Sequence, residues 1–308
     1  MKIVITGALG HIGSRVIREI PSVFPRAEIV MLDNLSTQRY CSLFNLPSSG
    51  RYCFLEADIL TADLASVFSG IDVVIHLAAI TDASTSFEIK NQVERVNFVG
   101  TQGVAQACVE AGCTLIFPST TSVYGVQSGV VDEDCPITDL RPQSPYAESK
   151  LKAEQYLQTL GKTAGLRFVI CRFGTICGTS IGMRFHTAIN KFCWQAAMGQ
   201  PITVWRTAMD QKRPYLDLSD AIRAMFFIID NDMFNNKTYN VVTVNTTVRE
   251  ICKLIEETVP DITIEYVDSR IMNQLSYTVS NEKFREAGFE FSGDLRTEIL
   301  DTIRMLGK

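Results

Sequence analysis

Tyr146 and Lys150 are four residues apart in a stretch with helical periodicity that begins just after Pro145. Residues at this spacing lie on one face of a helix. A lysine ammonium beside a phenol favours the phenolate and lowers its pKa from about 10. Tyr146 is therefore a candidate acid/base group for chemistry near neutral pH. The same spacing also occurs on the solvated faces of ordinary helices, so the pair alone does not identify a catalytic site.

A second group of polar residues follows a predicted strand at residues 115–118. The sequence there is Ser119-Thr120-Thr121-Ser122, and it ends in Tyr124-Gly125. In a doubly wound sheet, ligands bind beyond the carboxyl ends of the strands. Several of these hydroxyl groups are expected where a substrate would meet Tyr146, whereas others satisfy amides of the local turn.

Three glycines, Gly7, Gly10 and Gly13, follow the predicted first strand and lead into a helix. Glycine at this spacing permits a tight turn, close approach of the backbone to a pyrophosphate, and contact between helix and strand. The N-terminus of the helix, at His11 and Ile12, offers free N–H groups and the positive end of a dipole. The alternative is a plain glycine-rich turn.

Carboxylates after the next two strands indicate which dinucleotide would bind. Asp33 stands twenty residues after Gly13, at the end of the second predicted strand, and Asn34 follows it. A carboxylate there accepts hydrogen bonds from ribose hydroxyls and repels a 2′-phosphate, which favours NAD over NADP. Asp58 and Ile59 follow the third strand and are candidates for contact with the adenine. The alternatives are a turn residue for Asp33 and a helix cap for Asp58.

The elements that must position these residues alternate between strand and helix. Short apolar runs at residues 3–6, 29–32, 53–56, 73–77, 115–118 and 168–173 predict buried strands, and residues 93–111 and 146–160 have helical periodicity. This alternation predicts an α/β fold, a Rossmann-type doubly wound parallel sheet.

The pattern changes after residue 173. A segment rich in glycine and threonine, residues 174–182, shows no strand soon after it, and helices are expected at 219–230 and 246–258, with strands at 238–244 and 263–267. The sequence thus predicts a smaller C-terminal α+β portion. Residues 1–172 with 216–242 would form the dinucleotide-binding domain, and residues 173–215 with 243–308 the substrate-binding portion.

Composition excludes several classes of protein. The net charge of −5 argues against nucleic acid or an anionic membrane as partner. Nine scattered cysteines without a C-x-x-C pair, and only three histidines, argue against a zinc site and fit a reducing compartment. No apolar run reaches about 18 residues, and the N-terminus does not resemble a signal peptide. We therefore expect a soluble cytoplasmic protein without a metal.

Taken together, these motifs resemble the extended short-chain dehydrogenases that act on nucleotide-sugars, the NAD-dependent epimerase/dehydratase family, which includes UDP-glucose 4-epimerase. The resemblance covers nearly the whole chain. Besides the glycine turn, the hydroxyl run and the Tyr146/Lys150 pair, it rests on four further segments: His76-Leu77-Ala78-Ala79, Asn97-Phe98-Val99-Gly100-Thr101, Arg172-Phe173-Gly174-Thr175, and the run from Lys212 to Asp220.

The resemblance implies a role for each matching residue. Tyr146 would exchange the proton of the sugar hydroxyl that is oxidised, Lys150 would bind the nicotinamide ribose, and Thr120 would bond the reacting oxygen. Arg213 would contact the substrate pyrophosphate, for which a guanidinium is well suited. Further expected contacts with NAD are Leu77, Ala78, Ala79, Asn97 and Phe173, and further expected contacts with substrate are Thr81, Asp82, Thr175 and Asn190.

The chain departs from the family pattern in the pocket. Many members have asparagine where this chain has Thr175, and Gly174 replaces a larger residue, so the family's substrate-binding asparagine cannot be transferred. Residues 182–190 are then expected to help define the pocket. Trp205 lies near the strand that packs on the nucleotide base in relatives, although a tryptophan on a strand more often packs in a core.

Other departures concern the type of reaction. The 4,6-dehydratases of the family have an Asp-Glu pair after the catalytic threonine, and the decarboxylases have a glutamate at the second of these positions. Here the two residues are Thr121 and Ser122, whose hydroxyls lack a suitable pKa. A nucleotide-sugar 4-epimerase that works through a transient 4-ketosugar is therefore preferred. The alternatives are a 4-ketosugar reductase and a dehydratase that takes its acid from elsewhere, for which Asp82 is the candidate.

Two expectations concern partners. The helices at 93–111 and 146–160 are expected to pair with their copies in a homodimer, as in relatives, although their apolar residues can equally be used against the sheet alone. A module that only binds NAD is the non-enzymatic alternative, since some members of this fold sense NAD without catalysis. Such proteins usually lack the tyrosine and lysine pair.

Overall fold

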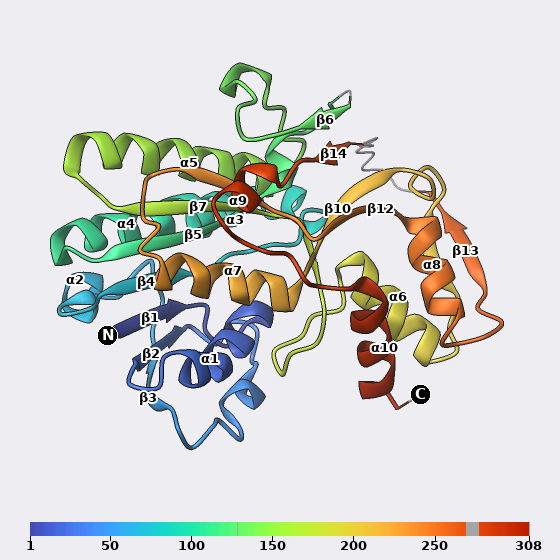
Figure 1. Ribbon diagram of the computed structural model, residues 1–308, viewed down its shortest axis with the longest axis horizontal. Coiled ribbons are helices and arrows are strands. Elements are labelled where there is room, and N and C mark those ends of the chain that lie inside the picture. The colour runs from blue at the N-terminus through green and yellow to red at the C-terminus, as the bar shows by residue number, and fades with distance from the viewer. Residues whose placement is uncertain (128, 269–276, 308) are drawn as a thin grey trace.

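The computed structural model (Figure 1) describes residues 1–308 apart from 128, 269–276 and 308, and has a seven-stranded parallel sheet at its centre. The strand order is β11-β7-β5-β4-β1-β2-β3. The strands are β1 (Lys2–Thr6), β2 (Glu28–Asp33), β3 (Arg51–Glu56), β4 (Val73–His76), β5 (Thr114–Thr120), β7 (Phe168–Phe173) and β11 (Thr238–Val241). The order reverses between β1 and β4, which is the place where doubly wound sheets bind ligands. The predicted fold class is confirmed.

Helices cover both faces of the sheet because successive side chains of each strand point to opposite sides. Ile3 and Ile5 of β1 belong to the same core as α1 (His11–Val23) and α7 (Leu218–Asp230). Val4 belongs to the core on the other face, with α2 (Leu64–Phe68), α4 (Gly100–Ala111) and α5 (Pro145–Ala164). Strands that are buried on both faces have continuous apolar sequences, which explains why these strands could be predicted from the sequence.

The helix expected at residues 93–111 is not uniform. It comprises α3 (Lys90–Val93), a π-helical segment η3 (Glu94–Val99) and then α4. The wider turn contains Asn97, which is 1% exposed. Its side chain accepts a hydrogen bond of 2.8 Å from the backbone N–H of Ile80 and donates one of 2.8 Å to the carbonyl of the same residue. π-Helical turns often occur at functional sites, and this one fixes the loop after β4.

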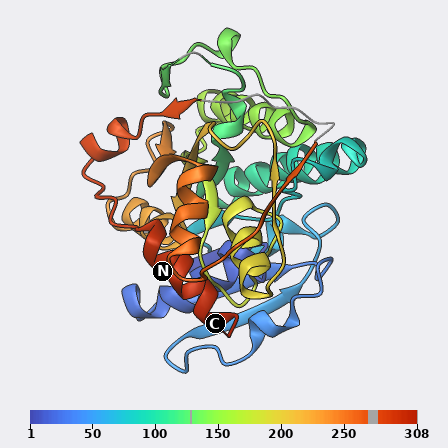
Figure 2. The same cartoon turned by 90° about the vertical axis from the view of Figure 1, so that its right-hand side faces the viewer.

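A smaller part lies beyond the carboxyl ends of the strands. It contains a three-stranded sheet in the order β12-β10-β8 and a pair of strands, β13 and β9. Helices α6 (Ala188–Ala197), α8 (Val248–Glu256) and α10 (Leu295–Met305) share a separate core with these strands. In Figure 2 the three helices, coloured yellow, orange and red, stand next to one another.

Two predictions for this part are wrong. A strand does follow residue 173 at once, because β8 (Thr175–Cys177) pairs with β10 (Lys212–Asp217). The single strand expected at residues 238–244 is instead two strands in different sheets, β11 and β12 (Val244–Thr247). The expected helix at 246–258 is the shorter α8, whose cap Thr247 accepts a hydrogen bond from the backbone N–H of Glu250. β9 (Ile202–Trp205) and β13 (Ile264–Val267) complete the part.

Short elements connect these parts. β6 (Val130–Val131) pairs with β14 (Thr278–Val279), and α9 (Glu282–Glu286) follows it. The 3₁₀ turns are η1 (Tyr40–Leu43), η2 (Thr85–Phe87), η4 (Thr121–Val123) and η5 (Ile137–Asp139). Phe284 of α9 lies in the core of the large sheet beside Tyr239. The division into two sequence domains given above therefore stays a proposal.

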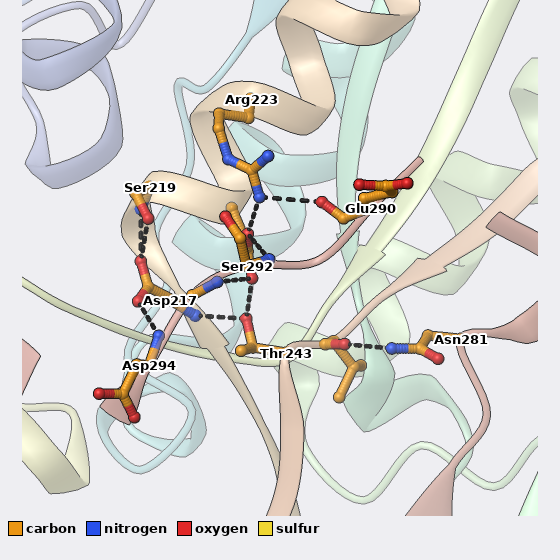
Figure 3. Close-up of polar contacts among 11 residues, drawn as sticks. Asp217, Ser219, Arg223, Thr243, Asn281, Glu290, Ser292 and Asp294 are labelled. Atoms are coloured by element: carbon orange, nitrogen blue, oxygen red, sulfur yellow. Dashed lines mark hydrogen bonds and ion pairs between the residues drawn. The ribbon is translucent and has the colours of Figure 1, made fainter. Parts of the chain in front are cut away.

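Two buried aspartates hold the C-terminal segment against α7 (Figure 3). Asp217 caps α7 through the N–H of Ser219 at 2.7 Å, and its other oxygen accepts the N–H of Asp294 at 3.1 Å. Asp220, which is 0% exposed, accepts hydrogen bonds from the Thr243 hydroxyl and from the backbone at residues 292 and 293. Buried carboxylates need such partners. These contacts join residues 292–294 to the start of α7 and to Thr243.

Among the described residues, no helix has both the length and the apolar character needed to cross a membrane. The same residues contain no cluster of three or more His, Cys, Asp or Glu side chains suited to a metal ion.

Candidate active site

The glycine-rich turn between β1 and α1 is shaped by steric limits. Gly7 has a φ of +67°, and a Cβ there would lie 2.6 Å from the backbone nitrogen of Ala78. A Cβ at Gly13 would lie 2.4 Å from the carbonyl oxygen of Gly7. Only glycine fits both positions without a shift of backbone. Helix α1 starts directly after Gly10, without a side-chain cap, so its first N–H groups face the turn.

Asp33 and Asp58 are fixed beside this turn. The carboxylate of Asp33 accepts hydrogen bonds from the backbone N–H of Leu9 at 3.0 Å and of Leu35 at 2.9 Å. Asp58 accepts one from the Asn34 side chain at 3.1 Å and caps its own turn through Leu60. The first carboxylate is thus held next to the glycine turn, where the resemblance expects the adenine ribose.

A buried histidine, His76, supports the segment that follows β4. The ring of His76 lies between the hydroxyls of Thr6, at 2.7 Å, and Thr101, at 3.0 Å. The Thr6 hydroxyl also accepts the N–H of Ala78 at 3.2 Å. Burial, with a smaller contribution from the charge of Lys150, lowers the pKa of His76 to about 3. A neutral ring therefore bridges the two threonines and positions the segment of Leu77, Ala78 and Ala79.

Tyr146 and Thr120 lie together at the carboxyl ends of the strands. Thr120 ends β5, and Tyr146 is in the first turn of α5, which Ser144 caps by accepting the N–H of Ala147 at 3.2 Å. Burial raises the pKa of the Tyr146 phenol, while the positive charge of Arg184 and a hydrogen bond with Thr120 act in the opposite direction. The fold therefore brings Tyr146 next to Thr120, two residues to which the sequence analysis gave catalytic roles.

Lys150 lies one turn further along α5 and is 4% exposed. Its ammonium donates a hydrogen bond of 2.8 Å to the carbonyl of Pro118 and lies 4.5 Å from the centre of the Phe117 ring. Burial lowers the pKa of Lys150 to about 7, and the nearby carboxylate of Glu154 opposes this shift. A buried lysine needs such a counter-charge to remain an ammonium at neutral pH.

The sequence analysis missed the group that supplies this counter-charge. Glu154 forms a buried ion pair with Arg172 at 2.7 Å and accepts a hydrogen bond from the Ser119 hydroxyl. The guanidinium of Arg172 also lies 4.8 Å from the Tyr124 ring centre, and the Tyr124 hydroxyl donates to Asn240 at 2.8 Å. The only signal in the sequence was the position of Glu154, four residues after Lys150.

A cavity of about 370 Å³ lies between the two parts of the chain. Eleven residues that the sequence analysis assigned to cofactor or substrate line it: Ile12, Leu77, Ala79, Thr81, Asp82, Thr120, Tyr146, Lys150, Phe173, Thr175 and Arg213. Trp205 also lines it and is 38% exposed, so it is not the core residue considered as an alternative. The fold thus collects the predicted catalytic groups around one space.

Other predicted residues lie outside this cavity. Gly7, Gly10, His11, Gly13, Asp33, Asn34, Asp58, Ala78 and Asn97 surround the glycine turn or support the segments beside it. Ile59, expected to contact the adenine, is 7% exposed and packs in the core against Gly100. Asn190, expected to touch substrate, is 0% exposed. Its side chain bonds the N–H of Gly178 at 3.3 Å and the carbonyl of Arg184 at 3.1 Å. Asn190 therefore holds the loop between β8 and α6 instead of lining the cavity.

Asp82 is the one carboxylate among the described residues that line the cavity. One of its oxygens accepts hydrogen bonds from the N–H and hydroxyl of Ser84 at 2.9 and 2.6 Å and from the N–H of Thr85 at 3.2 Å. Burial alone raises the pKa of Asp82, but these hydrogen bonds outweigh it and the net shift is downward. Asp82 is thus a turn cap that stays ionised, and it is poorly suited to donate a proton.

The loop between β8 and α6 brings an arginine and a histidine to the cavity that the sequence analysis did not name individually. Arg184 and His186 lie within the stretch 182–190 that was expected to define the pocket, and both line it. Burial lowers the pKa of His186 to about 4, with a further contribution from Arg184. Gly182 packs so closely on the glycine turn that a Cβ there would lie 2.4 Å from the Leu9 carbonyl oxygen.

Comparison with known proteins gives consistent matches. A model of the NAD dependent epimerase/dehydratase family matches residues 3–242. An uncharacterized UDP-glucose epimerase of Bacillus subtilis is 32% identical in an alignment of 249 residues that covers 78% of this chain and 76% of that protein. A trifunctional UDP-glucose 4,6-dehydratase, 3,5-epimerase and reductase of Arabidopsis thaliana is 31% identical over 93% of this chain, but the match spans only 44% of the relative.

A solved structure is also similar over its full length. UDP-glucuronic acid 4-epimerase of Bacillus cereus, in complex with UDP-glucuronic acid and NAD, superposes with a TM-score of 0.89. The two chains are 26% identical, and the match covers 99% of this chain and 100% of the other.

Proposed function

The chain belongs to the NAD-dependent epimerase/dehydratase family, and on that premise we propose that it is a nucleotide-sugar 4-epimerase that works through a transient 4-ketosugar. Its cofactor is NAD, as the sequence predicted. That it is an enzyme of nucleotide-sugar epimerisation or dehydration follows from the family and its relatives. The observation that favours epimerisation is a cavity in which Tyr146 lies beside Thr120 and the one carboxylate among the described lining residues, Asp82, stays ionised.

The residues around the glycine turn fit the dinucleotide. Gly7 and Gly13 leave no room for a Cβ, so the backbone there can approach a pyrophosphate closely. The carboxylate of Asp33, held beside the turn by Leu9, would bind the adenine ribose and repel a 2′-phosphate. Lys150 and Tyr146 would lie at the nicotinamide end of the site.

In the proposed mechanism, Tyr146 takes the proton from the C4 hydroxyl of the sugar and later returns it to the same oxygen. The positive charge of Arg184 and the hydrogen bond with Thr120 favour the ionised phenol of Tyr146, against the effect of burial. Lys150, whose ammonium form Glu154 favours, would bind the nicotinamide ribose. Thr120 holds the reacting oxygen through its hydroxyl. Bound NAD supplies the capacity to accept the C4 hydrogen with its electron pair and to return it to the other face of the sugar.

A 4,6-dehydratase would need an acid for the departing C6 hydroxyl and a base for C5. Thr121 and Ser122 occupy the positions that carry acids in dehydratases, and η4 places them directly after Thr120. Asp82 is held ionised by its hydrogen bonds with Ser84 and Thr85. These facts favour epimerisation over dehydration.

A 4-ketosugar reductase would need to exchange its cofactor in every cycle. Here the loop between β8 and α6 crosses the glycine turn: Nε2 of His11 donates to the Gly178 carbonyl at 2.8 Å, and the Gly182 N–H donates to the Ser14 hydroxyl at 2.9 Å. A loop fixed in this way favours a dinucleotide that stays bound between turnovers. An epimerase regenerates NAD in each cycle and needs no exchange.

Isotope labelling tests the proposal. Sugar nucleotides deuterated at C4, supplied as the UDP and dTDP forms of glucose and galactose, should be interconverted without added cofactor and should keep the label at C4. Solvent deuterium at C5 together with loss of water would instead identify a dehydratase. Conversion of a 4-ketosugar that depends on added reduced cofactor would identify a reductase.

We also propose that the chain forms a homodimer through α4 and α5. Phe98 and Tyr156 pack edge to face beside these helices, and Lys152 pairs with Glu94 across the same surface at 2.7 Å. Val99 is 48% exposed next to them. Light scattering at micromolar concentration should give twice the mass of the chain, and a monomer would contradict the proposal.

A further inference from the structure

We propose that Glu298 is a positioning residue for the cofactor. While its carboxyl group is protonated, it holds the loop between β8 and α6 on the glycine turn; when the group ionises, the loop loosens and NAD leaves faster. The inference rests on the NAD site at that turn, which is part of the proposed function, but not on the type of reaction. It adds control of cofactor retention by pH.

Glu298 lies in the first turn of α10 and packs on the start of this loop. The residue is 9% exposed, and its Oε2 is buried without a hydrogen-bond partner among the described residues. A Cβ at Gly178 would lie 2.4 Å from this oxygen, so the carboxyl group lies directly against the backbone of the loop. Burial of an ionised carboxylate that lacks hydrogen-bond donors is unfavourable. The contact with Gly178 is therefore suited to the protonated form.

A second carboxylate, that of Asp217, lies close to Glu298. Asp217 accepts hydrogen bonds from the backbone N–H of Ser219 at 2.7 Å and of Asp294, the cap of α10, at 3.1 Å (Figure 3). Burial raises the pKa of Glu298 to about 7, and the charge of Asp217 and a hydrogen bond with it act in the same direction. When two carboxyl groups share a site, one of them keeps its proton to higher pH. Glu298 therefore changes its charge near neutral pH.

The other charged groups around Glu298 do not cancel this effect. Asp301 of α10 also raises the pKa of Glu298, whereas Arg15 of α1 lowers it. The guanidinium of Arg15 also donates to the carbonyl of Thr179 at 3.3 Å. Asp220 of α7 adds a further carboxylate, because it and Glu298 both act on the same buried thiol of β8. Burial raises the pKa of the thiols that β8, α6 and α8 bring to this core, so they stay neutral: Cys177, Cys193 and Cys252.

The loop transmits the state of Glu298 to the glycine turn. Nε2 of His11 donates a hydrogen bond of 2.8 Å to the carbonyl of Gly178, the residue on which Glu298 packs. His11 is the first residue of α1, whose free N–H groups face the proposed pyrophosphate site. Repulsion between ionised Glu298 and Asp217 would separate α10 from the loop. The hydrogen bond that fixes Gly178 to His11 would then be weakened.

Lys150 also titrates near neutral pH, at the other end of the proposed cofactor site. Burial lowers its pKa to about 7, and loss of its charge would weaken binding of the nicotinamide ribose. Burial lowers the pKa of His11 to about 3 and that of His186 to about 4, so both rings stay neutral at this pH. The experiment must therefore separate Glu298 from Lys150.

The test is the rate at which bound NAD exchanges with excess deuterated NAD. The NAD-loaded protein is desalted rapidly after mixing, and mass spectrometry measures the label, at pH values on both sides of the pKa of Glu298, from about 6 to about 8.5. The wild-type rate should rise about fivefold or more with pH, the lower end of typical coupling between sites. Glu298→Gln stays neutral and can donate to Asp217, so its rate should stay slow and rise less than about twofold.

Two further variants serve as controls. Glu256→Gln removes an exposed carboxylate of α8 and should keep the wild-type pH dependence. Lys150→Met should exchange NAD faster but should also keep the rise with pH. A rise that persists in Glu298→Gln and is absent from Lys150→Met would assign the effect to Lys150 and overturn the proposal. A wild-type exchange rate that is constant over this range would overturn it without any substitution.

The inference and the proposed function can fail separately, because exchange is measured without sugar. If C4-labelled sugars are interconverted but Glu298→Gln exchanges NAD with the wild-type pH dependence, the inference is wrong and the 4-epimerase stands. If Glu298 sets the pH dependence of exchange but no epimer forms from any sugar tested, the inference stands and the 4-epimerase is wrong.

Discussion

The carboxylate of Glu154 lies one helical turn beyond Lys150 on α5 and is held by Arg172 from β7, with 2.7 Å between Nη2 and Oε2. Both side chains of this pair are almost fully buried, at 5% and 6% exposure. The negative charge is thereby fixed beneath the catalytic lysine. Because the interior screens charge poorly, its effect on Lys150 is larger than that of a surface carboxylate.

We predict that Glu154→Gln narrows the pH range of activity. Burial already lowers the pKa of Lys150 to about 7, and Glu154 acts to raise it. Without the carboxylate, Lys150 would lose its proton at lower pH, so the alkaline limb of kcat/KM should move toward lower pH. The unpaired Arg172 should also reduce the free energy of unfolding by about 3–5 kcal/mol.

Glu110→Gln on the surface of α4 is the matched control, since it removes a carboxylate that is exposed. It should change neither the pH profile nor the melting temperature. If folded Glu154→Gln protein has the same pH dependence of kcat/KM as the wild type, Glu154 does not control the protonation of Lys150.

A second prediction concerns Tyr146. Tyr146→Phe keeps the ring but removes the proton carrier, so turnover should fall by about 10² to 10⁴ while NAD binding and folding persist. Thr120→Val should have a smaller effect, because it removes one hydrogen bond. Steady-state kinetics at saturating substrate measures both. Turnover near the wild-type rate in Tyr146→Phe would show that another group moves the proton.

A third prediction separates steric clash from backbone strain at the glycine turn. Gly7 and Gly112 have nearly the same φ, +67° and +70°, but only at Gly7 would a Cβ meet backbone, 2.6 Å from the nitrogen of Ala78; nothing lies within 4 Å of one at Gly112. Gly112→Ala should therefore reduce the free energy of unfolding by about 1 kcal/mol, because only the left-handed backbone conformation is unfavourable for alanine there.

Gly7→Ala should destabilise the protein much more, and protein that does fold should have lost NAD affinity because the turn has moved. Thermal unfolding with and without NAD measures both effects. Equal melting temperatures for the two variants would mean that the contact with Ala78 does not constrain the turn.

The large sheet was predictable because its strands are buried on both faces and therefore form short apolar runs. The smaller part could not be predicted in this way. β8 has three residues and depends on its pairing with β10, about 40 positions later, so no local sequence pattern predicts it. The break between β11 and β12 at residues 242–243 also has no local signal, because both strands have high strand propensity and only their partners differ.

The residues of the candidate site likewise fall into those that the sequence predicted and those that it did not. Tyr146 and Lys150 were found because their spacing is local, and Asp33 because it follows a strand. Arg184 and Glu154 were missed because their meaning depends on distant partners: Thr81 for the first, and Arg172 for the second. The π-helical turn at η3 was missed because its residues continue the helical periodicity on either side.

The last prediction is that stability falls as the solution becomes acidic, through buried neutral histidine. Burial lowers the pKa of His76 from 6.5 to about 3. Between these values the unfolded chain binds a proton that the folded chain does not, so stability rises with pH in this window and is lost as pH falls from about 6.5 toward 3. At pH 5 this histidine should reduce the free energy of unfolding by about 2 kcal/mol.

His76→Gln removes the titrating ring but retains groups that can form hydrogen bonds with Thr6 and Thr101, so it should reduce the loss of stability between pH 7.5 and pH 5. His186→Gln is the comparison: the pKa of His186 is lowered to about 4, so by the same linkage its removal should also reduce that loss. Denaturant unfolding of the three proteins at both pH values provides the measurement. If His76→Gln loses as much stability on acidification as the wild type, protonation of His76 is not what limits stability in acid.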